Sequence, residues 1–225
     1  MTKNAKVSLT VVAVVIAVVA ALLVFTRLGE DAPTAQAGGD GAPPAVPASI
    51  LVRPDSHRLS DPAGAKVTVV EFLDLECEAC GAAYPGVERL RAEYGDRVTF
   101  VMRYFPIPSH QNAELAARTV EAAGKQGKLE PMYRLMFERQ SQWGDQRVSH
   151  RETFLGFARE LGLDLPAFEA ALDDPVTLGR VVADRTDGAN IGVEGTPTFF
   201  VNGVRFSGSP SYQALKAVID EELAK

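Results

Sequence analysis

The chemistry that this sequence can perform depends on two cysteines, the only ones in 225 residues. Cys77 and Cys80 flank the dipeptide Glu78-Ala79 and follow an apolar run. Zinc usually takes about four ligands, and the histidines of the chain are not spaced as ligands around this pair. A disulfide across so short a loop removes little entropy from the unfolded chain, so a structural crosslink is a weak interpretation. The pair therefore indicates a thiol–disulfide redox centre.

The elements around the cysteines favour a reactive thiol at Cys77. Residues 67–75 are apolar and rich in β-branched side chains, which predicts a central strand covered on both faces. Residues 79–94 show helical spacing of apolar side chains, so Cys77 would lie at a helix N-terminus. Backbone N–H groups and the helix dipole lower the pKa of a thiol there, although the neighbouring glutamates act in the opposite sense. We expect Cys77 to be the exposed nucleophile and Cys80, one turn later, the buried resolving cysteine.

Glu71 is a carboxylate inside the apolar strand, six residues before Cys77. One interpretation places its side chain in solvent at a sheet edge. The other makes it a buried acid below the active site, with a raised pKa, that exchanges protons with Cys80. The residues alone leave both interpretations open. Asp74, nearer to the strand end, is expected to be solvated or to cap backbone groups.

A second segment that could contribute to the site is Thr196-Pro197, which precedes a predicted strand near the C-terminus. A proline there can be an ordinary first residue of a strand. The bond before proline is also the one peptide bond that is readily cis. A cis bond would turn the backbone of Thr196 toward Cys77, where its N–H and C=O could pair with an extended substrate. Thr196 and Pro197 are therefore candidate substrate-binding residues.

The remaining chain predicts an α/β fold in the order β-α-β, helices, β-β-α. Residues 98–105 form the second strand, which the helical connection makes parallel to the first. A block of helices follows over residues 109–190, and Asn202-Gly203 marks a tight hairpin before a closing helix at 212–223. Smaller features are also expected: a short edge strand at 50–52, a helix start at Ser109, a capping box at 149–152 and a helix start at Asp174-Pro175.

The first residues predict a membrane segment. Residues 7–25 are apolar except for Ser8 and Thr10, and a helix of that length, at about 1.5 Å per residue, roughly matches the bilayer core. A signal peptide usually has a shorter apolar core, of about 7–15 residues, so an uncleaved single-pass anchor is favoured over a cleaved signal. Lys3 and Lys6 precede the run, which predicts a cytoplasmic N-terminus in the cell membrane and a catalytic domain on the extracytoplasmic side.

These features divide the chain into successive parts. They are a cytoplasmic N-terminus (1–6), a transmembrane anchor or signal (7–27), a flexible linker rich in Gly, Ala and Pro (28–49), the first part of the catalytic fold (50–108), an inserted helical domain (109–190) and the second part of that fold (191–225). The net charge of −6 argues against a partner that is a nucleic acid, because such binders usually carry a basic patch.

Several segments together resemble the thioredoxin superfamily and, within it, the DsbA-like thiol:disulfide oxidoreductases. The resemblance covers about residues 50–224 and rests on the segments 69–80, 103–106, 110–117, 126–128 and 192–203. It implies a thioredoxin fold with an inserted helical domain, with Cys77 as the attacking thiolate and Cys80 as its partner. It also implies Glu71 as the buried acid and Pro197 as a cis-proline. The dipeptide between the cysteines departs from many relatives, because it has no imidazole or aromatic ring to stabilise the thiolate.

The resemblance implies an enzyme that needs no cofactor beyond the redox-active disulfide of Cys77 and Cys80. Its expected function is extracytoplasmic thiol–disulfide exchange, as the oxidant of secreted or cell-surface proteins that contain cysteines. A membrane redox partner would recycle the active site, and the chain is expected to be a monomer. Two alternatives remain open: a reductase or isomerase with the same site, and a non-catalytic, membrane-tethered peptide-binding module.

Overall fold

The computed structural model describes residues 45–225. The expected transmembrane segment, 7–27, and most of the expected linker lie outside the described residues. Within the described range, none of the helices combines the length and the apolar character needed to cross a bilayer. Residues 45–49, which we assigned to the linker, contact the folded part of the chain. The N–H of Val46, for example, donates to the carbonyl oxygen of Gly203 at 2.8 Å.

A five-stranded sheet forms the centre of the fold, in the order β1-β3-β2-β4-β5. The strands are β1 (His57–Ser60), β2 (Val67–Leu73), β3 (Val98–Tyr104), β4 (Thr198–Val201) and β5 (Val204–Arg205). β2 runs parallel to β3 and antiparallel to β4, so it is an inner strand with neighbours on both sides. The predicted parallel pair, the central position of β2 and the α/β class are confirmed.

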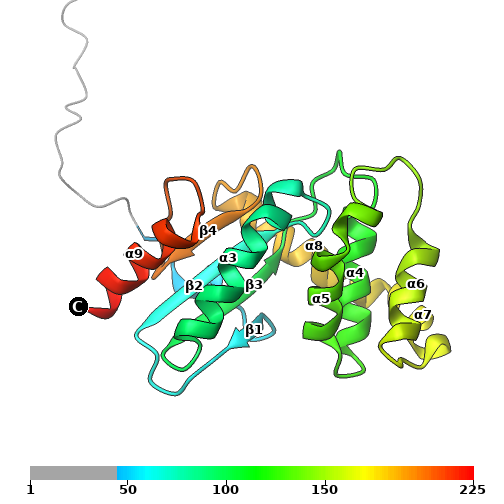
Figure 1. Ribbon diagram of the computed structural model, residues 1–225, viewed down its shortest axis with the longest axis horizontal. Coiled ribbons are helices and arrows are strands. Elements are labelled where there is room, and N and C mark those ends of the chain that lie inside the picture. The colour runs from blue at the N-terminus through cyan, green and yellow to red at the C-terminus, as the bar shows by residue number, and fades with distance from the viewer. Residues whose placement is uncertain (1–44) are drawn as a thin grey trace, which may run out of the picture. The chain divides into compact units, whose positions relative to one another are not determined.

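Helices cover both faces of the sheet. They are α2 (Ala48–Leu51), α3 (Glu78–Tyr94), α4 (Ala113–Gly124), α5 (Leu129–Glu138), α6 (Arg151–Glu160), α7 (Leu165–Asp173), α8 (Pro175–Asn190) and α9 (Tyr212–Leu223), with a short 3-10 turn at Gln140–Gln142. Figure 1 shows α3 and α9 side by side over one face, and α4 to α7 gathered beyond one end of the sheet. The helical block between β3 and β4 was therefore predicted correctly.

The two faces of β2 enter different parts of the core. Val67 and Val69 pack with Val87 and Leu90 of α3, because alternate residues of a strand point to the same side. Phe72, on the opposite face, packs in a separate apolar cluster. The chain segments just before and just after the helical block also contribute side chains to that cluster. Since both faces are covered by apolar side chains, a polar residue within this strand has little access to water. Glu71 is such a residue.

The hairpin between β4 and β5 was predicted from Asn202-Gly203 and is confirmed. Asn202 has φ +47° and Gly203 has φ +87°, so both residues of the turn have the positive φ that a two-residue type I′ turn requires. The predicted start of α8 is also confirmed. Asp174 caps it by accepting a hydrogen bond from the N–H of Val176 at 2.8 Å, and Pro175 is its first residue.

Three local predictions are wrong. Residues 50–52 do not form an edge strand; the chain turns into α2 after Pro47, and the N–H of Val52 bonds to the carbonyl of Ala48. The edge position is taken by β1, which we did not predict and which pairs antiparallel with β3. The capping box at 149–152 is absent, because α6 begins at Arg151 without a side-chain cap. The helix expected from Ser109 begins at Ala113.

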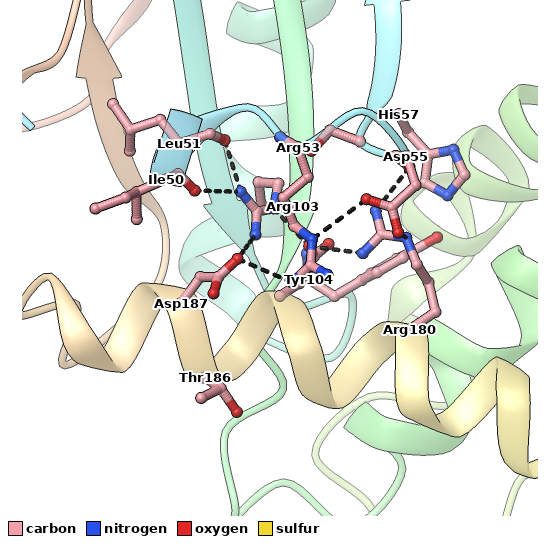
Figure 2. A network of polar contacts seen from close by, with 12 residues as sticks. Ile50, Leu51, Arg53, Asp55, His57, Arg103, Tyr104, Arg180, Thr186 and Asp187 are labelled. Carbon is pink, nitrogen blue, oxygen red and sulfur yellow. Dashed lines mark hydrogen bonds and ion pairs between the residues drawn. The ribbon is translucent and has the colours of Figure 1, made fainter. Parts of the chain in front are cut away.

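A buried network of charged side chains connects the end of β3 to α8 and to α2 (Figure 2). The side chain of Arg103 is 0% exposed and donates to Asp184 at 2.5 Å and to Asp187 at 2.6 Å. It also donates to the carbonyl oxygens of Ile50 and Leu51. Because the guanidinium has carboxylate and carbonyl partners, its burial is compensated. The network fixes the point where β3 ends and the next loop begins.

Candidate active site

The two cysteines lie where β2 has ended and α3 begins. Cys77 is the N-cap residue of α3, and its carbonyl oxygen accepts a hydrogen bond from the N–H of Gly81. Cys77 is half-buried, whereas Cys80 is only 1% exposed. Both are free thiols in this structure. The predicted difference, a second cysteine more buried than the first, is confirmed, although Cys77 is half-buried rather than exposed.

The surroundings shift the two thiols in opposite directions. The hydrogen bond with the side chain of Cys80 lowers the pKa of Cys77 to about 5, helped by Thr196 and by the backbone N–H groups of Ala79 and Cys80, although burial acts against them. Burial raises the pKa of Cys80 well above its ordinary value, and the charges of Cys77 and Glu71 add to that effect. At neutral pH, Cys77 is therefore favoured as a thiolate and Cys80 as a protonated thiol.

Thr196 and Pro197 lie opposite Cys77, as the sequence predicted. The peptide bond between them is cis. Sγ of Cys77 lies 3.4 Å from the carbonyl oxygen of Thr196. This contact connects two residues that are 119 positions apart in the sequence. The loop is held locally by the hydroxyl of Thr198, which donates to the carbonyl oxygen of Gly195 at 2.7 Å. The predicted cis bond and the predicted juxtaposition are confirmed, and substrate binding by this segment stays a prediction.

Glu71 is buried in the middle of the sheet. It pairs with Met102 of β3 and Phe199 of β4, and the residue is 7% exposed. Burial raises the pKa of its carboxyl group to about 8, with a further contribution from Glu88. The interpretation that placed Glu71 in solvent is wrong, and the buried position is confirmed. Because its charge raises the pKa of Cys80, the two groups are electrostatically coupled, while proton exchange between them stays a prediction.

Asp74 differs from our expectation of a solvated residue, because it is 2% exposed. It does act as a cap: Oδ1 accepts from the N–H of Glu76 at 2.8 Å, and Oδ2 accepts from the N–H of Ile107 at 2.9 Å. Burial raises its pKa against these hydrogen bonds. Its main chain reaches both cysteines, since its carbonyl accepts from the N–H of Cys77 and its N–H points at Sγ of Cys80, 3.5 Å away.

Residues of the helical block also form hydrogen bonds with the cysteine loop. The side-chain amide of Gln140 donates to the carbonyl oxygens of Leu75 at 2.8 Å and Cys77 at 2.9 Å. Glu76 is turned inward, where its carboxylate accepts from the N–H of Asn112 at 2.6 Å. The sequence offered no signal for Gln140 or Asn112, because both contacts connect segments far apart in the chain.

A cavity of about 320 Å³ opens beside the nucleophile. Its lining residues come from the cysteine loop, the loop after β3 and the helical block: Glu76, Cys77, Glu78, Ala79, His110 and Asp145. His110 is the one imidazole among these lining residues, and our sequence reasoning gave it no role in the site. Between residues 45 and 225, no three or more His, Cys, Asp or Glu side chains are arranged so that they could hold a metal ion.

A family model described as thioredoxin matches residues 59–221. The chain belongs to the thioredoxin family. A thioredoxin-like oxidoreductase from Silicibacter pomeroyi DSS-3 shares 27% identity and a TM-score of 0.67, over 80% of this chain and 99% of that one. BdbD from Bacillus subtilis has the same TM-score at 20% identity, over 83% and 100% of the two chains, and Wolbachia pipientis alpha-DsbA1 also shares the fold, with a TM-score of 0.67. This thioredoxin-family chain thus has the fold of DsbA-like thiol–disulfide oxidoreductases.

Curated relatives of this thioredoxin-family chain are much longer than it is. The protein from Salinispora arenicola called Na(+)/H(+) antiporter NhaA 1 is 39% identical over 177 residues, which is 78% of this chain and 26% of the relative. The chain therefore spans about a quarter of the length of the curated relatives it matches. Antiport is named for those whole proteins, and the matched quarter corresponds to the thioredoxin-like part described above.

Proposed function

We propose that this protein catalyses thiol–disulfide exchange on the outer side of a membrane, where its Cys77–Cys80 disulfide oxidises cysteine pairs in secreted or surface proteins. The family and the fold support exchange chemistry as such. The apolar run at 7–25 and the lysines before it support the location. Disulfides persist in oxidising compartments, so an extracytoplasmic site suits a protein that makes them.

The observation that carries the oxidant role is the position of Cys77 as the N-cap of α3, within hydrogen-bond reach of the Cys80 side chain and of the backbone of Cys80 and Ala79, which lowers its pKa to about 5 from an ordinary 9.0. Stabilising the thiolate stabilises the reduced protein, because the disulfide form carries no such charge. At neutral pH, a Cys77 pKa of about 5 makes the equilibrium constant for reduction of the disulfide about a hundredfold larger than an ordinary thiol would. In a two-electron couple this raises the reduction potential by about 60 mV. The reduced state is therefore favoured, and the disulfide is correspondingly a stronger oxidant.

The exchange proceeds in two steps. A substrate thiolate attacks Sγ of Cys77, the Cys77–Cys80 bond breaks, and the sulfur of Cys80 leaves with the electron pair and takes up a proton. The second substrate thiolate then attacks the substrate sulfur bound to Cys77. A substrate disulfide forms and Cys77 leaves as a thiolate. In total, two electrons pass from the substrate dithiol to the protein.

The other site residues support these steps. Glu71 supplies the proton that the sulfur of Cys80 needs as it leaves; its pKa of about 8 and the effect of its charge on Cys80 support this role. The backbone of Thr196 and the ring of Pro197 offer an extended substrate a docking edge next to Sγ of Cys77. We further propose that the chain works as a monomer and that a membrane redox partner re-oxidises its dithiol.

A glutathione redox titration of the full chain tests the direction of electron flow. A midpoint nearer to about −120 mV than to about −270 mV supports an oxidant, and a value below about −250 mV would overturn that role in favour of a reductase. The Cys77→Ser variant is the control, because it can form no disulfide with Cys80. Full cellular activity of that variant would instead indicate a non-catalytic binding module.

Two further measurements test substrates and location. In Cys80→Ser the resolving thiol is missing, so mixed disulfides with substrates should accumulate on Cys77 and can be identified by mass spectrometry. The same variant has a single cysteine, which a membrane-impermeant maleimide should label in intact cells. Labelling only after the cells are broken would contradict the extracytoplasmic location.

A further inference from the structure

The loop after β3 brings an imidazole to the nucleophile. His110 lines the same cavity as Cys77, and its side chain is 32% exposed. Its Nδ1 lies 2.7 Å from Oδ2 of Asp74. Nε2 has no hydrogen-bond partner within residues 45–225. The histidine is thus held at one nitrogen and lines the cavity onto which Cys77 opens.

Asp74 fixes both His110 and the cysteine loop. The same carboxylate that binds the imidazole accepts hydrogen bonds from the N–H groups of Glu76 and Ile107, so it cannot rotate without losing them. Its carbonyl receives the N–H of Cys77 at 3.1 Å. A carboxylate at Nδ1 keeps a proton on that nitrogen, and its negative charge favours a second proton on Nε2, which makes the ring an imidazolium. Asp74 acts through His110 and is therefore a positioning residue.

The charges around the cavity explain why an imidazolium matters there. The charged or titratable groups that face His110 are Asp74, Glu76, Cys77, Glu78 and Asp145, together with Glu114 and Arg185 across an adjoining cavity of about 220 Å³. Three of the groups that line the Cys77 cavity are carboxylates, and each disfavours a thiolate. His110 is the only side chain lining that cavity, among the described residues, that can carry a positive charge.

The electrostatic coupling between the two groups runs in both directions. Desolvation lowers the pKa of His110, but the hydrogen bond and charge of Asp74, followed by the charges of Cys77 and Glu76, raise it overall. A negative charge on Cys77 therefore favours the proton on His110. By the reciprocity of linked equilibria, a proton on His110 favours the thiolate of Cys77 to the same extent.

We propose that protonated His110, held by Asp74, is the counter-ion that stabilises the Cys77 thiolate as it leaves the mixed disulfide. It supplies from the loop after β3 the positive charge that the Glu78-Ala79 dipeptide lacks. In this step the bond between Cys77 and the substrate sulfur breaks, the substrate disulfide forms, and the electron pair stays on Sγ of Cys77. His110 keeps its proton throughout. The inference rests on the proposed exchange function and assigns a residue to it.

The matched test is His110→Gln in the full chain, because glutamine can still donate to Asp74 but carries no charge. Thiolate absorbance near 240 nm, followed against pH in the reduced protein, gives the pKa of Cys77. We expect that pKa to rise by about one unit, and the equilibrium constant for reduction by glutathione to fall about tenfold, which corresponds to about 30 mV. His150→Gln is the control, since His150 bonds to Thr153 and Gln146 and does not line the cavity.

A second measurement does not depend on how His110→Gln folds. The pKa of His110, followed by NMR in the reduced protein, should be higher than in Cys77→Ser, because that variant has no thiolate. Reciprocity requires this shift to match that of Cys77 in His110→Gln. Equal His110 values in the two proteins, or a Cys77 pKa in folded His110→Gln within a few tenths of the parent, would overturn the inference. A parent chain that does not exchange with glutathione at all would instead overturn the proposed function, and the thiolate titration would still report on His110.

Discussion

The amide of Gln140 donates to the carbonyl oxygen of Cys77 at 2.9 Å, so a residue of the helical block holds the nucleophile's own backbone. Its second hydrogen bond, to Leu75, fixes the residue at the other end of the same loop. Gly81 is part of this arrangement. A Cβ on Gly81 would collide with the Gln140 amide, so a larger residue at position 81 would displace that amide from its hydrogen bonds.

The contact between Gly81 and Gln140 predicts a non-additive pair of mutations. Gln140→Ala should lower the free energy of unfolding by about 1–3 kcal/mol, because two carbonyl groups lose their donor. Gly81→Ala should lower it by a similar amount, because the new methyl group displaces the same amide. In the Gln140→Ala background, Gly81→Ala should instead be neutral or stabilising by about 0.5–1 kcal/mol, since alanine is the better helix former. Denaturant unfolding of the four proteins measures the coupling, and strictly additive effects would contradict the steric argument.

The buried carboxyl group of Glu71 should make stability fall with rising pH. Its folded-state pKa of about 8 lies above the ordinary 4.5, so the group costs nothing below about pH 4.5, where both states bind the proton. The cost grows as pH rises toward 8 and then stays constant, at roughly 5 kcal/mol as an upper limit. Glu71→Gln should lack this slope and should therefore be more stable than the parent at pH 9 but not at pH 4. Unfolding at both pH values checks it, and a parallel loss of stability in the two proteins would contradict the assignment.

The alkylation of Cys77 should follow its thiolate. We expect the rate with iodoacetamide to rise through about pH 5 and to be nearly level from pH 7 to 8, whereas an ordinary thiol would still be gaining reactivity there. Cys80 should stay unmodified in the folded protein because it is buried with a raised pKa. Cys77→Ser is the matched control and should react only after unfolding. A midpoint near pH 8.5 in the parent would show that the thiol is not activated.

The Arg103–Asp184 ion pair predicts a large loss of stability when it is broken. Both side chains are 0% exposed, so Asp184→Asn leaves a buried guanidinium with less compensating charge. The expected cost is about 3–5 kcal/mol. Asp173→Asn removes one carboxylate from an exposed pair with Arg151 and should cost less than about 1 kcal/mol. Equal effects of the two substitutions, measured by thermal unfolding, would argue against burial as the cause.

The parts of the fold that were predictable are those with a local physical cause. The turn at Asn202-Gly203 needs positive φ at two consecutive residues, and Asp174-Pro175 combines a side-chain cap with a fixed φ. Strand β1 (His57–Ser60) has no alternating apolar pattern, so only its pairing with β3 defines it. Residues 50–52 are three apolar residues, too few to distinguish a strand from one turn of helix.

In the active site, too, the predictable features are those with a local cause. Cys77, Cys80 and Pro197 are recognisable by residue type and spacing. The burial of Glu71 stayed open until the structure placed β2 between two neighbouring strands. The surroundings of Asp74 could not be predicted, because its partners Ile107 and His110 lie 33 and 36 residues away and reach it only once β3 is in place. Interactions across such separations depend on register and loop geometry, and these leave no mark on residue spacing.

The hydrogen bond between Val46 and Gly203 has a practical consequence for protein production. A shortened chain starting at residue 50, where we first expected the domain to begin, would lose this bond and would cut through α2. The carbonyl oxygens of Ile50 and Leu51, which accept hydrogen bonds from Arg103, would then sit at a fraying end. A truncation for solution studies should therefore keep residue 45 and everything after it.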